Sequence, residues 1–171
     1  MTDLLDSLKI EPISKAHVRD KFSCGKPLLN QYLQRHARQN DVNNISKTFV
    51  AADEKNVVHG FYTLSAASIE FEELPEDAAK NIPKYPIPAA RIGKFAIDKN
   101  SSKQGLGEKL LIDALRRIES TSNKMAIKAV LVDALDEDAK GFWLKYEFIE
   151  LPQNDLKLFL PIETIHQLFN K

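Results

Sequence analysis

The sequence predicts one α/β domain over residues 1–171, with a mixed, mostly antiparallel sheet flanked by α-helices. With 171 residues, of which 43% are hydrophobic, the chain can bury one sizeable core but hardly two. The predicted elements are helices, a β hairpin, a strand-loop-helix unit, and a closing pair of strands. The run Lys128–Ala134 is almost continuously apolar, which is typical of a strand buried on both faces.

The N-terminal region is predicted to be mainly helical. Ser14 suits the N-cap of a short helix over Lys15–Lys21, and Pro27 suits the first turn of a second helix. After Pro27, one face of the second helix is marked at helical spacing by Leu28, Leu29, Tyr32, Leu33, His36 and Ala37. Two helices are therefore expected before the first strand.

A β hairpin and a long connector follow. Lys47–Ala52 and Val57–Ala66 have the composition of strands, and a polar turn over residues 53–56 separates them. Acidic residues and four prolines between Ser68 and Pro88 favour a short helix and then an extended surface loop. We expect this loop to connect parts of one domain rather than two domains.

The stretch Arg91–Glu119 combines a strand, a glycine turn and a helix. The apolar run Phe95–Ile97 ends at a polar segment, and Gly105 and Gly107 then lead into the helix. The helix is expected to bury one stripe, formed by Leu106, Leu110, Leu111, Ala114, Leu115 and Ile118. Backbone N–H groups without intrahelical partners, the helix dipole and the missing side chains of the glycines favour a polyphosphate at the start of this helix.

Residue spacing excludes two common phosphate-binding loops. A P-loop requires Gly-Lys-Ser/Thr directly before its helix, whereas Glu108 and Lys109 follow Gly107. A dinucleotide fingerprint requires a third small residue where Leu110 stands, and a shorter link from the strand. A tight turn without any ligand remains the alternative at this point.

The C-terminal third is predicted to contain a helix, two strands and a last helix. The first helix is expected over Asp138–Lys145, and the strands over Phe148–Leu151 and Lys157–Leu160. Pro161 suits the start of the last helix, because a proline at the first helical position loses no hydrogen bond.

Composition limits the class of protein. Lys plus Arg and Asp plus Glu both number 24, so any contact with nucleic acid must come from a local basic patch. The single cysteine, Cys24, excludes an intrachain disulfide, and His17, His36, His59 and His166 lack metal-ligand spacing. No segment approaches the roughly 20 apolar residues of a membrane span, so we expect a soluble cytoplasmic protein without a metal.

Several segments resemble one protein superfamily. Gln104-Gly105-Leu106-Gly107, between a strand and a long helix, resembles the acetyl-CoA pyrophosphate loop of the GNAT N-acetyltransferases. One branch, the bacterial acetyltransferase toxins of type II toxin-antitoxin systems, is resembled by further segments in the same order: Phe22–Gly25, Leu29–Leu33, Ser46–Val50, Ile92–Asp98 and Leu158–Pro161. The resemblance covers nearly the whole chain and implies the single-domain GNAT fold.

The resemblance implies acetyl transfer from acetyl-CoA to the α-amino group of an aminoacyl-tRNA, which blocks translation. It assigns the pantetheine arm and the thioester carbonyl to Phe95, Ala96 and Ile97, and the pyrophosphate to Lys103, Gln104, Gly105, Leu106, Gly107 and Glu108. The basic candidates for tRNA contact are Arg35, Arg38, Lys47, Arg91 and Lys94. A ribbon-helix-helix antitoxin and a homodimer are the implied partners.

The chain departs from the family at the catalytic tyrosine, where Trp143 stands. An indole N–H can donate a hydrogen bond but cannot deliver its proton to a leaving thiolate and recover it. Tyr146 lies one helical turn further on, and Glu147 stands where the family has glycine. Three alternatives remain open: a water or Tyr146 acts as the acid, the thiolate leaves unassisted, or the chain binds CoA without turnover.

Two other functions also remain open. The chain could acetylate a small amine or a protein N-terminus, or it could be a CoA-binding or antitoxin-binding module that has lost catalysis. The first alternative keeps the acetyl-CoA site and changes the acceptor. The second keeps the binding of CoA or of an antitoxin without catalysis, and it is suggested by Trp143 in the place of the catalytic tyrosine.

Overall fold

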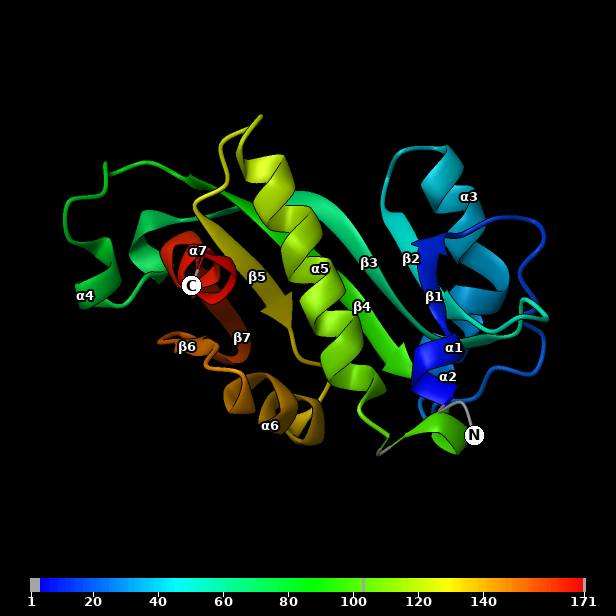
Figure 1. Cartoon of the computed structure of the whole chain (residues 1–171). Helices are drawn as coiled ribbons and strands as arrows, with labels where there is room; N and C mark the ends of the chain where they lie inside the picture. Colours follow the sequence, from blue (N-terminus) through cyan, green and yellow to red (C-terminus); the bar gives the residue numbers. More distant parts are fainter. Residues whose placement is uncertain (1–3, 103, 171) are drawn as a thin grey trace. The chain divides into compact units, whose positions relative to one another are not determined.

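A computed structural model describes residues 4–102 and 104–170. Its sheet has the strand order β1-β2-β3-β4-β5-β7-β6 (Figure 1). The strands are β1 (Lys9–Pro12), β2 (Lys47–Ala52), β3 (Val58–Ile69), β4 (Ile87–Ile97), β5 (Ala129–Asp133), β6 (Ile149–Leu151) and β7 (Asn154–Pro161). β4 and β5 are parallel, whereas β1–β2, β2–β3, β5–β7 and β6–β7 are antiparallel. The predicted mixed, mostly antiparallel sheet is therefore confirmed.

Helices occupy most of the predicted positions. The α-helices are α1 (Leu4–Ser7), α2 (Pro27–Gln31), α3 (Ala37–Val42), α4 (Glu76–Ala79), α5 (Leu106–Ser122), α6 (Glu137–Lys145) and α7 (Ile162–Phe169). A π-helical turn, Tyr32–His36, joins α2 to α3, and two 3₁₀ turns cover Phe71–Glu73 and Lys99–Ser101. α1 and β1 were not predicted, because their short sequences carry no clear apolar period.

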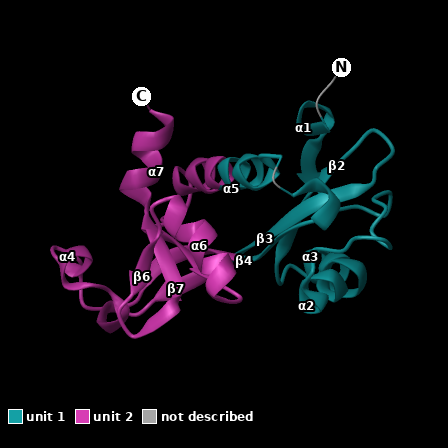
Figure 2. Cartoon of the chain, turned by 90° about the horizontal axis from the view of Figure 1, so that it is seen from below, with its two compact units in different colours: residues 1–65, 93–114 teal, residues 66–92, 115–171 magenta. Residues whose placement is uncertain are grey.

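The chain forms two compact units. Unit 1 contains residues 1–65 and 93–114, and unit 2 contains residues 66–92 and 115–171. β3, β4 and α5 run from one unit into the other (Figure 2). The single domain over residues 1–171 stays a prediction.

The core of unit 1 is built around Phe61, which is fully buried. The Phe61 ring meets Phe22 edge-on, with centroids 5.6 Å apart, and lies nearly parallel to Tyr32 at 6.4 Å. At Gly60, an added Cβ would lie 2.9 Å from Leu110 Cδ1 and 3.3 Å from the Ala96 carbonyl oxygen. The missing side chain therefore lets the first turns of α5 pack closely on β3.

The core of unit 2 surrounds β5, as the apolar run predicts. Val130 and Val132 are fully buried, and Leu131 is almost so. Leu131 belongs to a cluster that also contains Ile69, Ile87 and Phe159. The prediction of a strand buried on both faces is therefore confirmed.

The helix predicted over Lys15–Lys21 is wrong. Ser14 starts a turn, with the His17 N–H 3.3 Å from the Ser14 carbonyl oxygen, but the chain then becomes extended. Val18 forms a bridge with Val57: the Val18 N–H donates to the Asn56 oxygen at 2.7 Å, and the Val58 N–H donates to the Val18 oxygen at 3.1 Å. These backbone hydrogen bonds to the hairpin replace those of a helix, and sequence periodicity does not report such tertiary partners.

Helix α6 ends in a Schellman motif. The Phe148 N–H donates to the Trp143 oxygen at 3.2 Å, and the Glu147 N–H donates to the Leu144 oxygen at 3.1 Å. The Trp143 and Phe148 rings lie 5.1 Å apart, which is the apolar contact that accompanies this motif. Glu147 therefore adopts φ +72°, a left-handed conformation that favours glycine.

We predict that Glu147→Gly stabilises the protein by about 1 kcal/mol, because glycine adopts the left-handed conformation without the steric cost of a Cβ atom. Glu147→Ala is the matched control, since it removes the carboxylate but keeps the Cβ. Urea denaturation of both variants measures the free energy of unfolding. A glycine variant no more stable than the alanine variant would contradict the prediction.

Candidate functional site

The predicted phosphate loop joins β4 to α5. Gly105 has φ +85°, so the turn uses the left-handed conformation for which glycine is suited. The Lys109 N–H donates to the Gly105 oxygen at 3.1 Å and closes the first helical turn. The N–H groups of Leu106, Gly107 and Glu108 belong to the first turn of α5, where the helix offers them no acceptor. They lie beside the exposed residues Gln104 and Gly105. Lys103, the predicted cation of this loop, lies outside the described residues.

Both ends of the loop are held by hydrogen bonds. On the helix side, Lys109 Nζ donates to the backbone oxygens of Leu5, at 2.6 Å, and Leu8, at 3.1 Å. On the strand side, the Ser101 hydroxyl lies 2.7 Å from His59 Nδ1. The backbone amides at the start of α5 are therefore presented by a segment anchored before and after its glycine turn.

The residues predicted to bind pantetheine lie at the end of β4. Ala96 is buried in the core of unit 1, whereas Phe95 and Ile97 are half-buried. Among the described residues, β4 pairs with β5 over Ala89–Ile92 and then continues to Ile97. The Lys94 N–H donates to the Thr63 side-chain oxygen at 2.8 Å. The strand was predicted, but this hydrogen bond to a side chain was not.

Four of the predicted basic residues belong to unit 1. Arg35 lies in the π-helical turn and Arg38 in α3, and within residues 4–102 and 104–170 neither makes an ion pair. Lys47 donates to the Asp41 backbone oxygen at 3.1 Å and lies 3.6 Å from its carboxylate. Lys94 Nζ lies 5.4 Å from the centroid of the Tyr32 ring, at a cation–π distance. Arg35 and Arg38 are therefore the cations most available to an anionic partner.

Arg91, the remaining basic candidate, belongs to unit 2. Its guanidinium forms a charge-assisted hydrogen bond with the Asp133 carboxylate at the end of β5. The side chain of Arg91 is one-third exposed. A contact between Arg91 and an external anion would therefore compete with Asp133.

Arg19 is a basic residue that sequence reasoning missed. Its guanidinium donates to the Leu33 oxygen at 2.9 Å. Burial, and secondly the positive charge of Arg38, lower the pKa of Arg19. Arg19 adds positive charge to the surface that carries Arg38. The sequence did not indicate Arg19 as a basic candidate, because Arg19 lies outside the second predicted helix, which supplied Arg35 and Arg38.

The two candidate catalytic residues occupy different environments at the C-terminal end of α6. Trp143 is buried, and the centroid of its ring lies 5.1 Å from the ring centroids of both Phe142 and Phe148. Tyr146 follows the helix and is half-buried, with its ring 5.0 Å from Phe142 and 5.5 Å from Lys145 Nζ. Trp143 thus contributes to packing at the helix end, and Tyr146 is the more accessible of the two.

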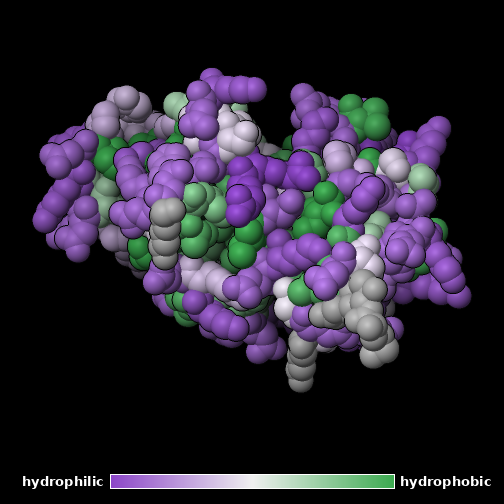
Figure 3. All heavy atoms as spheres, viewed as in Figure 1, coloured by the Kyte–Doolittle hydropathy of each residue, from purple (hydrophilic) through white to green (hydrophobic). Residues whose placement is uncertain are grey.

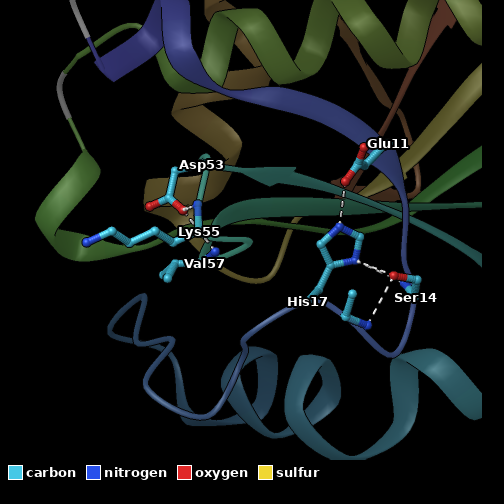
Figure 4. A network of polar contacts seen from close by, with 7 residues as sticks. Glu11, Ser14, His17, Asp53, Lys55 and Val57 are labelled. Carbon is cyan, nitrogen blue, oxygen red and sulfur yellow. Dashed lines mark hydrogen bonds and ion pairs between the residues drawn. The ribbon is translucent and has the colours of Figure 1, made fainter.

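Two histidines take part in polar networks of unit 1. His17 is buried, and its ring contacts Glu11 at 2.8 Å and the Ser14 N–H at 3.0 Å (Figure 4). His59 connects Asp53, at 2.9 Å, with Ser101, at 2.7 Å. In the part of the chain that the structure describes, no group of three His, Cys, Asp or Glu side chains could hold a metal ion.

Asp53 collects several donors at the turn between β2 and β3. Its carboxylate accepts from the Lys55 N–H at 2.9 Å and the Val57 N–H at 3.0 Å (Figure 4). It also lies 2.9 Å from Nε2 of the His59 ring. Burial raises the pKa of the Asp53 carboxyl, but the hydrogen bonds from His59, Val57 and Lys55 outweigh it and place the pKa below its ordinary value. The folded protein therefore favours the ionised carboxylate.

Hydrophilic side chains cover most of the face shown in Figure 3. Among the residues described, no helix is both long and apolar enough to span a membrane.

Curated relatives match the chain over nearly its full length. The chain is 34% identical to a tRNA-acetylating toxin of Mycobacterium tuberculosis, over 91% of this chain and 93% of the relative. It is 32% identical to a probable toxin TacT of Sinorhizobium fredii, over 93% of each chain. No protein-family model matches the sequence.

Solved structures of toxins share the fold. A KacT variant in which a tyrosine is replaced has a TM-score of 0.92 and 33% identity, over 95% of this chain and 99% of that one. AtaT in complex with acetyl-methionyl-tRNA has a TM-score of 0.89 and 31% identity, with the same coverage. An AtaT–AtaR complex bound to acetyl-CoA has a TM-score of 0.85 and 32% identity, over 96% and 99% of the chains.

We predict that Asp53→Asn destabilises the protein at neutral pH and that this difference from wild type shrinks in acid. Because the folded-state pKa of Asp53 is lowered, its contribution is present above the unfolded value of 3.8 and is lost as the pH falls through the folded-state pKa. Urea denaturation at about pH 7 and about pH 3 measures the difference. An equal difference at both pH values would contradict the prediction.

Proposed function

This chain belongs to the family of tRNA-acetylating toxins, and we propose that it transfers the acetyl group of acetyl-CoA to the α-amino group of an aminoacyl-tRNA, which blocks translation. The observation that carries the proposal is the full-length similarity to such a toxin, at 34% identity. The glycine turn and the amides at the start of α5 support it, because they suit a pyrophosphate.

The donor site is formed by β4 and the loop before α5. We assign the pyrophosphate to residues 103–108 (Lys103, Gln104, Gly105, Leu106, Gly107 and Glu108), and the pantetheine arm to Phe95, Ala96 and Ile97. When bound, acetyl-CoA supplies an activated thioester carbonyl. Backbone N–H groups of β4 are suitable donors for the negative charge that develops on its oxygen. A free α-amino group titrates at about pH 8, so a useful fraction is already neutral and nucleophilic.

Tyr146 is the proposed acid for the leaving thiolate, and Trp143 supports it. A phenol can deliver a proton and recover it, whereas an indole N–H cannot. Tyr146 follows directly on the helix end that Trp143 and Phe148 stabilise. Trp143 therefore fixes the backbone from which the Tyr146 side chain extends.

The acceptor tRNA is proposed to contact the basic residues Arg35, Arg38, Lys47, Arg91 and Lys94. The chain as a whole has a formal charge of +0, so attraction to phosphates has to be local. Arg35 and Arg38 carry most of this role, because Lys47 and Arg91 each have an aspartate partner.

Partners and location follow from the same proposal. Aminoacyl-tRNA is found in the cytoplasm, so the protein acts there. A ribbon-helix-helix antitoxin is the proposed protein partner, in line with the AtaT–AtaR complex. The homodimer that the family resemblance implies stays a prediction.

Cell-free translation tests the function directly. We expect the protein to arrest synthesis only when acetyl-CoA is present, with acetylated aminoacyl-tRNA recovered from the reaction. Arrest without acetyl-CoA, or no arrest at a saturating concentration, would contradict the proposal. Acetylation of an added small amine or peptide in place of tRNA would instead favour the alternative acceptor.

We predict that Tyr146→Phe lowers kcat by about 100-fold, because it removes the proposed general acid. Tyr85→Phe is the matched control, since Tyr85 is an exposed tyrosine in the connector to which we assign no role. Release of free CoA with saturating charged tRNA gives kcat for both variants. If Tyr146→Phe is as fast as wild type, a water acts as the acid or the thiolate leaves unassisted.

We predict that neutralising Arg35, Arg38 and Lys94 together weakens tRNA binding for all amino acids and lowers its salt dependence, by about 1 in slope for each phosphate that these residues neutralise in the wild type. Replacement of the exposed residues Lys84 and Lys124 by alanine is the control for a general change in charge. Fluorescence anisotropy over a range of salt concentrations measures the slope. An unchanged slope in the triple variant would exclude these residues as phosphate ligands.

A further inference from the structure

A partly buried polar network joins three parts of unit 1. His59 in β3 lies between Asp53, in the turn after β2, and Ser101, in the 3₁₀ turn before the phosphate loop. His59 Nε2 is 2.9 Å from the Asp53 carboxylate, and His59 Nδ1 is 2.7 Å from the Ser101 hydroxyl. A carboxylate only accepts hydrogen bonds, so Nε2 carries a proton; in the neutral ring Nδ1 then accepts from the Ser101 hydroxyl.

The arrangement has the order of a Ser-His-Asp triad, but it cannot act as one. The nucleophilic serine of such a triad has to reach a substrate carbonyl. Ser101 is only 2% exposed, so no substrate can approach its hydroxyl. The network therefore serves to hold a position rather than to attack a substrate.

The segment that it holds leads into the phosphate loop. His59 contacts this segment twice: its backbone oxygen accepts from the Asp98 N–H at 2.8 Å, and its ring accepts from Ser101. Ser23 adds two bonds, from its N–H to the Asp98 carboxylate at 3.0 Å and from the Lys99 N–H to its oxygen at 2.8 Å. Ser101 is the last residue of the 3₁₀ turn, and the loop to α5 begins at the next residue.

The Asp53 carboxylate fixes the His59 ring in turn. Two backbone N–H groups of its own turn, from Lys55 and Val57, orient the carboxylate (Figure 4). The side chains of His59 and Asp53 are 18% and 25% exposed, so water competes only partly for their hydrogen bond. The contact with Asp53 thus fixes the orientation of the His59 ring, and in the neutral ring it leaves Nδ1 as the acceptor that faces Ser101.

We propose that His59 is a positioning residue for acetyl-CoA: by accepting from Ser101 it sets the position of the phosphate loop. This inference rests on the proposed function, because it assumes that the loop binds the pyrophosphate. In this proposal His59 acts through Ser101 and not by touching the donor or the acceptor. Its loss should therefore raise KM for acetyl-CoA and leave kcat nearly unchanged, because a displaced loop weakens binding of the donor.

Two substitutions of His59 separate its two hydrogen bonds. Asparagine places its amide near the position of Nδ1 and keeps the bond to Ser101, whereas glutamine places its amide near Nε2 and keeps the bond to Asp53. We expect His59→Gln to raise KM for acetyl-CoA by about fivefold to tenfold, which corresponds to the loss of about one hydrogen bond. His59→Asn is expected to raise it by less than about twofold. Thermal unfolding of both variants separates this effect from a general loss of stability.

A double-mutant cycle completes the test. Ser101→Ala should raise KM as much as His59→Gln, and the two together should have no larger effect than either alone, because they remove the same hydrogen bond. Equal KM values for His59→Gln and His59→Asn, or a wild-type KM in Ser101→Ala, would overturn the inference.

Calorimetry of the wild type with acetyl-CoA keeps the two proposals apart. No binding would contradict the proposed function and this inference with it, whereas binding equal to wild type in His59→Gln would contradict the inference alone.

Discussion

Backbone N–H groups at the start of α5 are the constraint on which the proposed donor site depends. An anion can use these groups only if the preceding turn exposes them and if no side chain blocks the approach. Gly105 meets both conditions, because its left-handed conformation turns the chain sharply and it has no side chain. The bonds from Lys109 to the α1 region and from Ser101 to His59 then keep this turn in place from both sides. A flexible loop would lose conformational entropy on binding the pyrophosphate, whereas an anchored loop has lost most of it on folding.

Local sequence signals predicted the elements that form this site. The glycines before a helical apolar period predicted the turn and α5, and the run Lys128–Ala134 predicted β5. These signals suffice because turn chemistry and apolar periodicity are properties of neighbouring residues. The helix over Lys15–Lys21 failed for the opposite reason, since Val18 pairs with Val57, far along the chain. The network of Asp53, His59 and Ser101 was missed on the same grounds, because Ser101 is 42 residues from His59.

The end of α6 shows how a departure from the family pattern can be structural. Trp143 is buried against Phe142 and Phe148, and its backbone oxygen accepts from Phe148 in the helix cap. Glu147 takes up the left-handed position where the family has glycine, which costs stability. The sequence identified both positions as unusual but could not reveal that they belong to one capping motif. Tyr146, between them in the chain, retains a half-buried ring with a phenolic hydroxyl.

Transfer of label from acetyl-CoA to tRNA tests the proposed activity most directly. Purified protein is incubated with acetyl-labelled acetyl-CoA and either charged or deacylated tRNA of the same preparation. We expect label on charged tRNA alone, recovered as an N-acetylated aminoacyl ester after nuclease digestion. No label on charged tRNA at a saturating donor concentration, or equal label on deacylated tRNA, would contradict the proposed function.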